Sequence, residues 1–147
     1  MARMQIIFDG FKDLAERIDR IDSDTLEQAV EDALEATGEY IQKQVEKAAA
    51  PYAKKGGGLK GYATGEMFKA IKKDQTVHWY GKVAEVSVGF NLYEFEGWVS
   101  IFVMYGTPRM SKDQKVYNAI KGSKTQKEIA SIQEEIMLKY LDLVEGN

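Results

Sequence analysis

The sequence predicts an α+β fold: a small antiparallel sheet with a long N-terminal helix and a C-terminal helix packed on it. Three patterns indicate this class. Apolar residues recur every three or four positions over 24–50, residues 76–90 alternate between apolar and polar side chains, and a second helical stripe covers 125–144. With 147 residues, 44% of them hydrophobic, the chain can bury one core, and we expect a single domain over 1–147.

The clearest predicted element is the helix at 24–50. Asp24 can cap its N-terminus, and Glu27 follows at the capping-box spacing. Pro51 ends it, because proline lacks an amide proton and restricts the residue before it. The apolar stripe of this helix consists of Leu26, Val30, Ala33, Leu34, Thr37, Ile41, Val45 and Ala48.

Before this helix, residues 4–11 read as a short strand ending in an Asp-Gly turn. A short amphipathic helix with Leu14, Ile18 and Ile21 on one side follows. The start of the chain does not fit a secretory signal, because a charge and a glycine interrupt the apolar stretch that such a signal needs.

After the long helix, residues 64–73 predict a short helix that Thr64 can cap. The 76–90 segment predicts a β-hairpin that turns at Gly81 and Lys82, with Val77 and Trp79 on one face and His78 and Tyr80 on the other.

Towards the C-terminus, the apolar run 98–105 fits either a strand or a buried helix and is too short to span a membrane. Residues 111–122 predict a helix closed by Gly122. Ser123 or Thr125 can cap the last helix. Its predicted stripe is Ile129, Ile132, Ile136, Tyr140 and Leu143.

The glycine-rich stretch at about 52–63 contains Gly56, Gly58 and Gly61 at the spacing G-x-G-x-x-G. A dinucleotide fingerprint requires a strand before it and a helix opening directly from it, whereas here a long helix and a proline come first. A P-loop also fails, because Tyr62 and Ala63 replace its Lys-Ser/Thr pair. We therefore expect a flexible loop, or one that orders against a partner, because consecutive glycines lose much entropy on ordering.

The charges of the chain fall into three blocks. Residues 1–50 carry 6 basic and 12 acidic side chains, residues 51–127 carry 13 and 6, and residues 128–147 carry 1 and 5. A basic segment often indicates nucleic-acid binding. Here the same chain also supplies the opposite charge, so self-association, or pairing of the middle with the ends within one chain, explains the pattern at least as well. The candidate interface residues in the basic block are Lys54, Lys55, Gly56, Gly57, Gly58 and Lys60.

A second candidate interface is the aromatic group Tyr93, Phe95 and Trp98 around Gly97. Aromatic side chains near a loop often mark a protein interface. The sequence leaves open the alternative that these rings fold down onto the hairpin.

Enzymatic chemistry has little support in the sequence. His78 is the single histidine, and the sequence indicates no nucleophile or acid that would act with it in catalysis. Glu94 and Glu96 lie two residues apart in a loop, where carboxylates are usually solvated. The chain has no cysteine and no metal-ligand spacing that includes histidine, so we expect no metal and no cofactor.

Several short motifs occur in a recognisable order: “VSVGF” (86–90), then “SIFVMYGTPRM” (100–110), then a helical C-terminus. In their order they resemble the minor tail-component family of long-tailed bacteriophages and prophages, also described as neck or tail-completion proteins. Met104 departs from the family pattern, since many members carry glutamate there. The matching positions are Ala50-Pro51, Thr64-Gly65-Glu66-Met67, Val88-Gly89-Phe90, Tyr105-Gly106-Thr107-Pro108-Arg109 and the closing helix 125–144.

This resemblance implies a structural role and no enzymatic one. Such proteins are similar to components of the head–tail junction, and related neck proteins assemble as rings around the DNA passage. The implied partners are other phage neck or tail proteins and further copies of this chain, without specific nucleic-acid binding or a membrane. The implied location is the virion, after assembly in the cytoplasm of the bacterial host.

The charge blocks suggest how such a ring would form. The basic middle of one subunit would contact the acidic helices of the next, with the 52–63 loop ordering there; reversing Lys54, Lys55 and Lys60 would test this. The main alternative is a nucleic-acid-binding module. It would use Lys54, Lys55, Lys60, Lys72, Lys73 and Lys82. An enzyme that uses His78 and the loop carboxylates ranks last.

Overall fold

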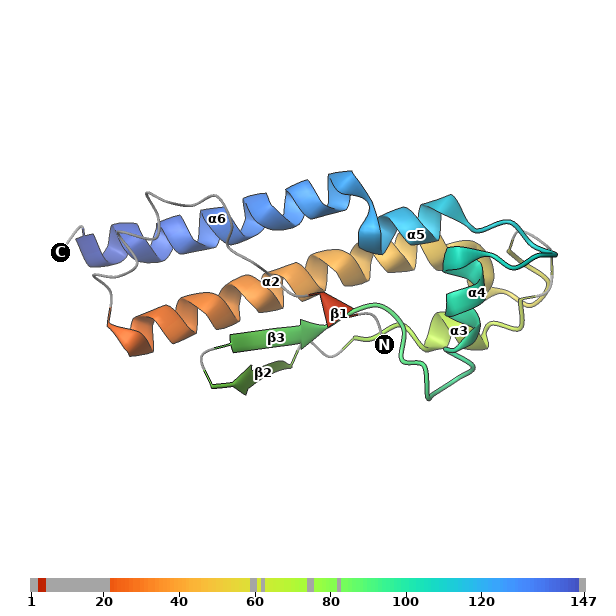
Figure 1. Cartoon of the computed structure of the whole chain (residues 1–147), viewed down its shortest axis with the longest axis horizontal. Helices are drawn as coiled ribbons and strands as arrows, with labels where there is room; N and C mark the ends of the chain where they lie inside the picture. The colour runs from red at the N-terminus through yellow and green to blue at the C-terminus, as the bar shows by residue number, and fades with distance from the viewer. Residues whose placement is uncertain are drawn as a thin grey trace.

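A computed structural model describes residues 3–4, 22–58, 61, 63–73, 76–81 and 83–145, and for residues 3, 4, 23, 144 and 145 it describes the backbone alone. The α+β class is confirmed. Two long helices, α2 (Ser23–Ala49) and α6 (Ser123–Glu145), lie antiparallel, side by side, and a small sheet packs against α2 (Figure 1). Shorter helices gather at the end of the molecule where α2 finishes (Figure 1).

The α2 helix forms where its apolar periodicity predicts it. Its N-cap, however, is Asp22 and not Asp24, because the Asp22 carboxylate accepts both the backbone N–H and the hydroxyl of Thr25, each at 2.8 Å. Asp24 is already inside the first turn, where its negative charge complements the helix dipole. The α-helix ends just before Pro51 as predicted, and the chain continues as the 3₁₀ helix η1 (Ala50–Ala53).

The sheet has the strand order β1-β3-β2 and is antiparallel throughout. The predicted hairpin is confirmed as β2 (Val77–Tyr80) and β3 (Val83–Ser87), with Val77 opposite Val86 and Tyr80 opposite Val83. β1 (Arg3–Met4) pairs with β3. The rest of the strand predicted at 4–11, and the helix predicted with Leu14, Ile18 and Ile21, lie outside the described residues.

The predicted 64–73 helix is shorter than expected. α3 (Glu66–Lys69) makes a single turn, because Ile71 leaves it to form an antiparallel bridge with Phe90. The amide of Lys72 donates to the Gly89 carbonyl at 2.7 Å, which extends this pairing.

The segment 98–105, for which the sequence allowed a strand or a helix, forms helix α4 (Val99–Tyr105), and Gly106 ends it. Helix α5 (Gln114–Lys121) starts after Asp113, whose carboxylate accepts from the amides of Lys115 and Val116. Gly122 separates α5 from α6 as predicted. Thr125 does not cap α6; its hydroxyl lies within the helix and donates to the Asn118 carbonyl at 2.8 Å.

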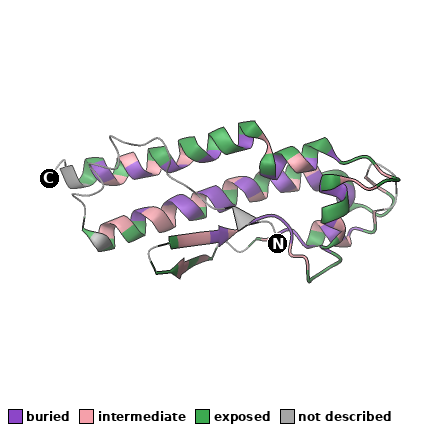
Figure 2. Cartoon of the chain, in the orientation of Figure 1, coloured by how far each residue is buried: buried purple, intermediate pink, exposed green. Residues whose placement is uncertain are grey.

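The buried side of α6 differs from the predicted stripe. Its line runs through Thr125, Ile129, Gln133, Met137 and Leu141, while Leu143 is 65% exposed. The prediction differs because it followed apolar residues, whereas two of the buried positions of α6, Thr125 and Gln133, are polar. The side-chain amide of Gln133 donates to the Thr37 hydroxyl of α2 at 3.2 Å, and that hydroxyl donates to the Ala33 carbonyl at 2.8 Å. Figure 2 shows the buried residues of α2 and α6 along their common contact.

Candidate interaction surface

Helix α4 carries an apolar face that points to solvent. Trp98, Ile101, Phe102 and Tyr105 follow the spacing i, i+3, i+4 and i+7, so they share one side of the helix. Their exposed fractions are 53%, 44%, 42% and 52%. The rings of Trp98 and Phe102 meet edge to face, with centroids 5.9 Å apart. We call these four residues the α4 face; the exposed positions of α4 are green in Figure 2.

The opposite side of α4 is buried in the core. Ser100, Val103 and Met104 are each at most 5% exposed. α4 is therefore largely apolar on both sides, although only one side packs within the described part of the chain. A helix of this kind is usually buried all round. Its outer side is thus typical of a surface that another protein covers.

The loop before α4 presents two more aromatic side chains. Tyr93 is 88% exposed and Phe95 is 52% exposed. Phe95 and Glu96 have φ angles of 48° and 57°, a left-handed conformation that costs roughly 1–3 kcal/mol per non-glycine residue. The backbone at position 97 passes so close to Asn91 that a Cβ would lie 1.7 Å from the Asn91 carbonyl oxygen. Glycine is therefore required at the end of this loop. The aromatic side chains named from the sequence therefore lie on the surface, and do not fold down onto the hairpin.

Lysine side chains border the α4 face on its α5 side. Tyr105 and Tyr117 meet edge to face at 5.9 Å. The Lys121 ammonium lies 5.3 Å from the Tyr105 ring, and the Lys112 ammonium lies 4.5 Å from the Tyr117 ring. The hydrogen bond with Tyr105 raises the pKa of Lys121 further above neutral pH, where the ammonium of a lysine is already charged. Aromatic rings with adjacent cations are typical of protein interfaces.

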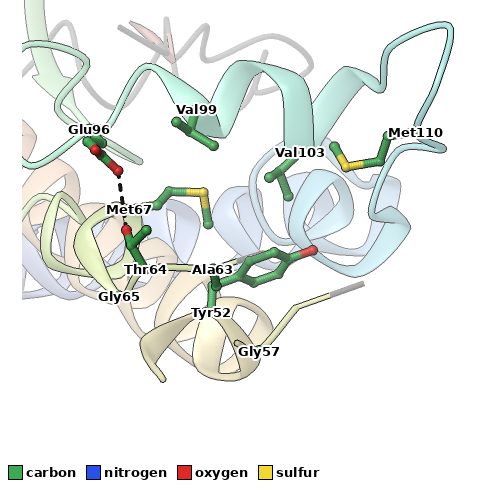
Figure 3. Close-up of a pocket in the computed structure, with 10 residues that line it drawn as sticks. All are labelled: Tyr52, Gly57, Ala63, Thr64, Gly65, Met67, Glu96, Val99, Val103 and Met110. Carbon is green, nitrogen blue, oxygen red and sulfur yellow. Dashed lines mark hydrogen bonds between the residues drawn. The ribbon is translucent and has the colours of Figure 1, made fainter. Parts of the chain in front are cut away.

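Below α4 lies an apolar pocket of about 160 Å³. Figure 3 shows Val99 and Val103 pointing from α4 towards Met67 and Tyr52. At its mouth the Thr64 hydroxyl donates to the Glu96 carboxylate at 3.2 Å. The pocket is lined by Tyr52, Gly57, Ala63, Thr64, Gly65, Met67, Glu96, Val99, Val103 and Met110.

The Tyr52 side chain links this pocket to helix α5. Its hydroxyl donates to Asp113 at 2.7 Å, and both side chains are buried. The same carboxylate caps α5, so the pocket wall, the 3₁₀ helix η1 and α5 are held together at one residue.

The glycine-rich stretch packs against the same pocket. The Gly56 amide donates to the Ala63 carbonyl at 2.7 Å, and a Cβ at Gly58 would lie 2.5 Å from the Tyr52 ring. These glycines therefore allow the backbone to approach Tyr52 closely. Lys54 and Lys55 are exposed, Tyr52 and Ala53 belong to η1, and Leu59, Lys60 and Tyr62 lie outside the described residues. Whether this loop orders further against a partner stays a prediction.

The residues of the family-like motifs occupy turns and core positions. Gly65, Gly89 and Gly106 have φ angles of 91°, 97° and 79°, which favour glycine. Val88 and Phe90 are buried. The N-cap of α3 is Gly65 and not Thr64, whose hydroxyl accepts from the amide of Glu66 one residue before the cap. The turn after α4 is closed by a bridge between Thr107 and Met110 across Pro108 and Arg109, and the Thr107 hydroxyl accepts from the amide of Arg109.

The residues named for enzymatic chemistry are not brought together. His78 is exposed on β2, one of the two outer strands of the described sheet. Glu94 and Glu96 are exposed in the loop before α4. Across the described ranges, no group of three His, Cys, Asp or Glu side chains is arranged to hold a metal ion. Within the same ranges, no helix combines the length and apolarity of a membrane span.

A scan against protein-family models and searches of curated proteins and solved structures found no match. The α4 face was only partly visible in the sequence. Trp98 and Tyr105 were named, but Ile101 and Phe102 were not, because an unbroken apolar run does not reveal which side will be covered.

Proposed function

We propose that this chain is a non-enzymatic structural protein of the head–tail junction or tail of a bacteriophage or prophage, acting through protein–protein assembly. The observation that carries the assembly role is the exposed α4 face, which places four large apolar side chains on one side of a short helix. Burying such side chains stabilises an association by roughly 25 cal/mol for each Å² of apolar surface removed from water. The phage context comes from the motif order described above.

The turns of the motifs support the same proposal. Gly106 ends α4 immediately after Tyr105, and the Thr107–Met110 bridge fixes the following turn beside the α4 face. The Tyr-Gly-Thr motif therefore borders the proposed interface. Its role is to end the helix and set the direction of the chain, and it supplies no chemistry.

The phage role is tested on particles. We expect mass spectrometry of purified virions to detect this chain, and electron microscopy of lysates lacking its gene to show heads and tails that fail to join. Complementation with Phe102→Ser should fail, whereas complementation with Lys139→Ser, an exposed residue on α6, should succeed. Normal particles without the chain would overturn the proposal.

A second candidate function is nucleic-acid binding. Six basic residues fall within 109–127, and two of them stack on tyrosines. Fluorescence anisotropy with labelled DNA tests this function, because phosphate contacts make affinity fall steeply between 50 and 200 mM salt. An absence of binding at 50 mM salt would exclude it.

A further inference from the structure

The two ends of the molecule carry opposite charges. Residues 22–39 contain seven acidic and no basic side chains, whereas residues 109–127 contain six basic side chains and one acidic one, the buried Asp113. Figure 1 places these segments at opposite ends: the first half of α2 at one, and α5 with the start of α6 towards the other. α2 alone is about 40 Å long at 1.5 Å per residue. Charges this far apart gain little by attracting each other within one chain.

The acidic end has a regular arrangement. Glu27, Glu31, Glu35 and Glu39 follow one another at four-residue steps, so they form a row along α2. Like charges at this spacing destabilise an isolated helix. Glu31 accepts from the indole N–H of Trp79 at 2.8 Å, while Glu27, Glu35 and Glu39 are exposed. A row of this kind is stabilised when cations from another molecule approach it.

The acidic end also offers an aromatic contact. Tyr80 is 63% exposed at the turn of the β2–β3 hairpin, next to Trp79, which binds Glu31 of α2. The acidic end thus combines carboxylates with an exposed ring. The α4 face combines exposed apolar side chains with Lys112 and Lys121. The two surfaces are complementary in charge, and both contain apolar groups to bury.

We propose that the α4 face, together with Lys112 and Lys121 at its border, binds the acidic first half of α2 in a second copy of this chain, head to tail. This inference rests on the assembly function proposed above and names its partner. After a single contact, one copy keeps a free acidic half of α2 and the other keeps a free α4 face, so the association repeats. It closes into a ring when the rotation between copies allows closure. The basic side of the contact lies on 109–127 and not on the 52–63 loop.

The test measures self-association of the full chain by analytical ultracentrifugation at low and high salt. We expect the wild type to associate at low salt and to dissociate as salt rises. The Lys112→Glu/Lys121→Glu variant and the Glu35→Lys/Glu39→Lys variant should each raise the dissociation constant at least about tenfold. Mixing the two variants should restore association, because each reversed end then meets a complementary one.

The controls separate this contact from other arrangements. Lys139→Glu, an exposed reversal elsewhere, should associate like the wild type, and circular dichroism should show that every variant is folded. A wild type that stays monomeric at low salt, or variants whose mixture does not associate, would overturn the head-to-tail contact. If Phe102→Ser dissociates the oligomer while the α2 reversal leaves it intact, the α4 faces pair symmetrically and the inference is wrong. None of these outcomes affects the virion test.

Discussion

Single residues set the shape of the loop that leads into α4. Asn91 accepts from the Tyr93 amide through its side chain, Phe95 and Glu96 adopt left-handed backbone angles, and Gly97 approaches the Asn91 carbonyl. The hydrogen bond from Thr64 to Glu96 ties this loop to the start of α3. The loop is therefore held in a strained shape that keeps Phe95 on the surface.

Gly97→Ala tests how far this geometry depends on one residue. A Cβ would lie 1.7 Å from the Asn91 carbonyl oxygen, so the backbone must shift, and we expect about 2–3 kcal/mol of destabilisation. Urea unfolding measures it. The matched control is Gly81→Ala, where φ is 64° but no atom lies within 4 Å, so only the left-handed backbone cost of about 1–2 kcal/mol applies. Equal losses in the two variants would contradict the predicted clash.

Asp22 gives the start of α2 a defined pH dependence. The hydrogen bonds from Thr25 lower the pKa of this carboxyl below its ordinary value of 3.8. A carboxyl with a depressed folded-state pKa contributes stability above its unfolded pKa and loses it as the pH falls through the folded value. We expect Asp22→Ala to lower Tm by about 2–4 °C at pH 7. The difference from the wild type should shrink as the pH falls below 3.8; a difference unchanged at pH 2 would refute this account.

At the scale of elements, the sequence predicts what depends on apolar periodicity. The α2 helix, the hairpin and the two C-terminal helices all follow from it, since one side of each packs on the core. The one-turn length of α3 could not be predicted, because Ile71 pairs with Phe90, a partner distant in sequence. The register of α6 was also missed, because Gln133 is a polar residue in a buried line.

The site was predictable only in part for a related reason. Tyr93, Phe95 and Trp98 could be named from the sequence because aromatic side chains near a loop often mark a protein interface. Ile101 and Phe102 belong to a run that would look the same if both sides of α4 were buried. Which side remains open depends on the packing of α4 against α5, which local sequence does not encode.

The hydrogen bond between Gln133 of α6 and Thr37 of α2 should make a measurable contribution to the free energy of unfolding. Thr37→Val leaves the buried Gln133 side-chain amide without this partner, so we expect it to cost about 1–3 kcal/mol. Gln133→Leu leaves the Thr37 hydroxyl bonded to the Ala33 carbonyl, so it should cost less. The double variant should cost less than the sum, with a coupling of about 0.5–1.5 kcal/mol. A double-mutant cycle by urea unfolding measures this; additive losses would mean that the hydrogen bond does not contribute.

At the scale of the whole molecule, the proposed assembly predicts that one substitution can raise the folding stability of a single copy and weaken the association between copies. The acidic row on α2 repels itself within one copy, and in the proposed contact the lysines of a second copy would offset this repulsion. Replacing a charge in this row should therefore improve the fold of the single copy while weakening the contact between copies. If the acidic row had no partner, the same replacement would change the stability of the single copy and leave the association between copies unchanged.

Glu35→Gln tests this trade-off, because Glu35 has Glu31 and Glu39 as neighbours at four residues on either side. Asp32, three residues before Glu35, adds a third repulsion, and removing all three should raise the free energy of unfolding by about 0.6–1.5 kcal/mol at 20 mM salt. The gain should be less at 0.5 M salt, where the charges are screened. Self-association at low salt should weaken at the same time. The control, Glu134→Gln on α6, has no acidic residue three or four positions away and should change neither quantity. A stabilised monomer that associates as strongly as the wild type would show that the acidic row does not form the contact.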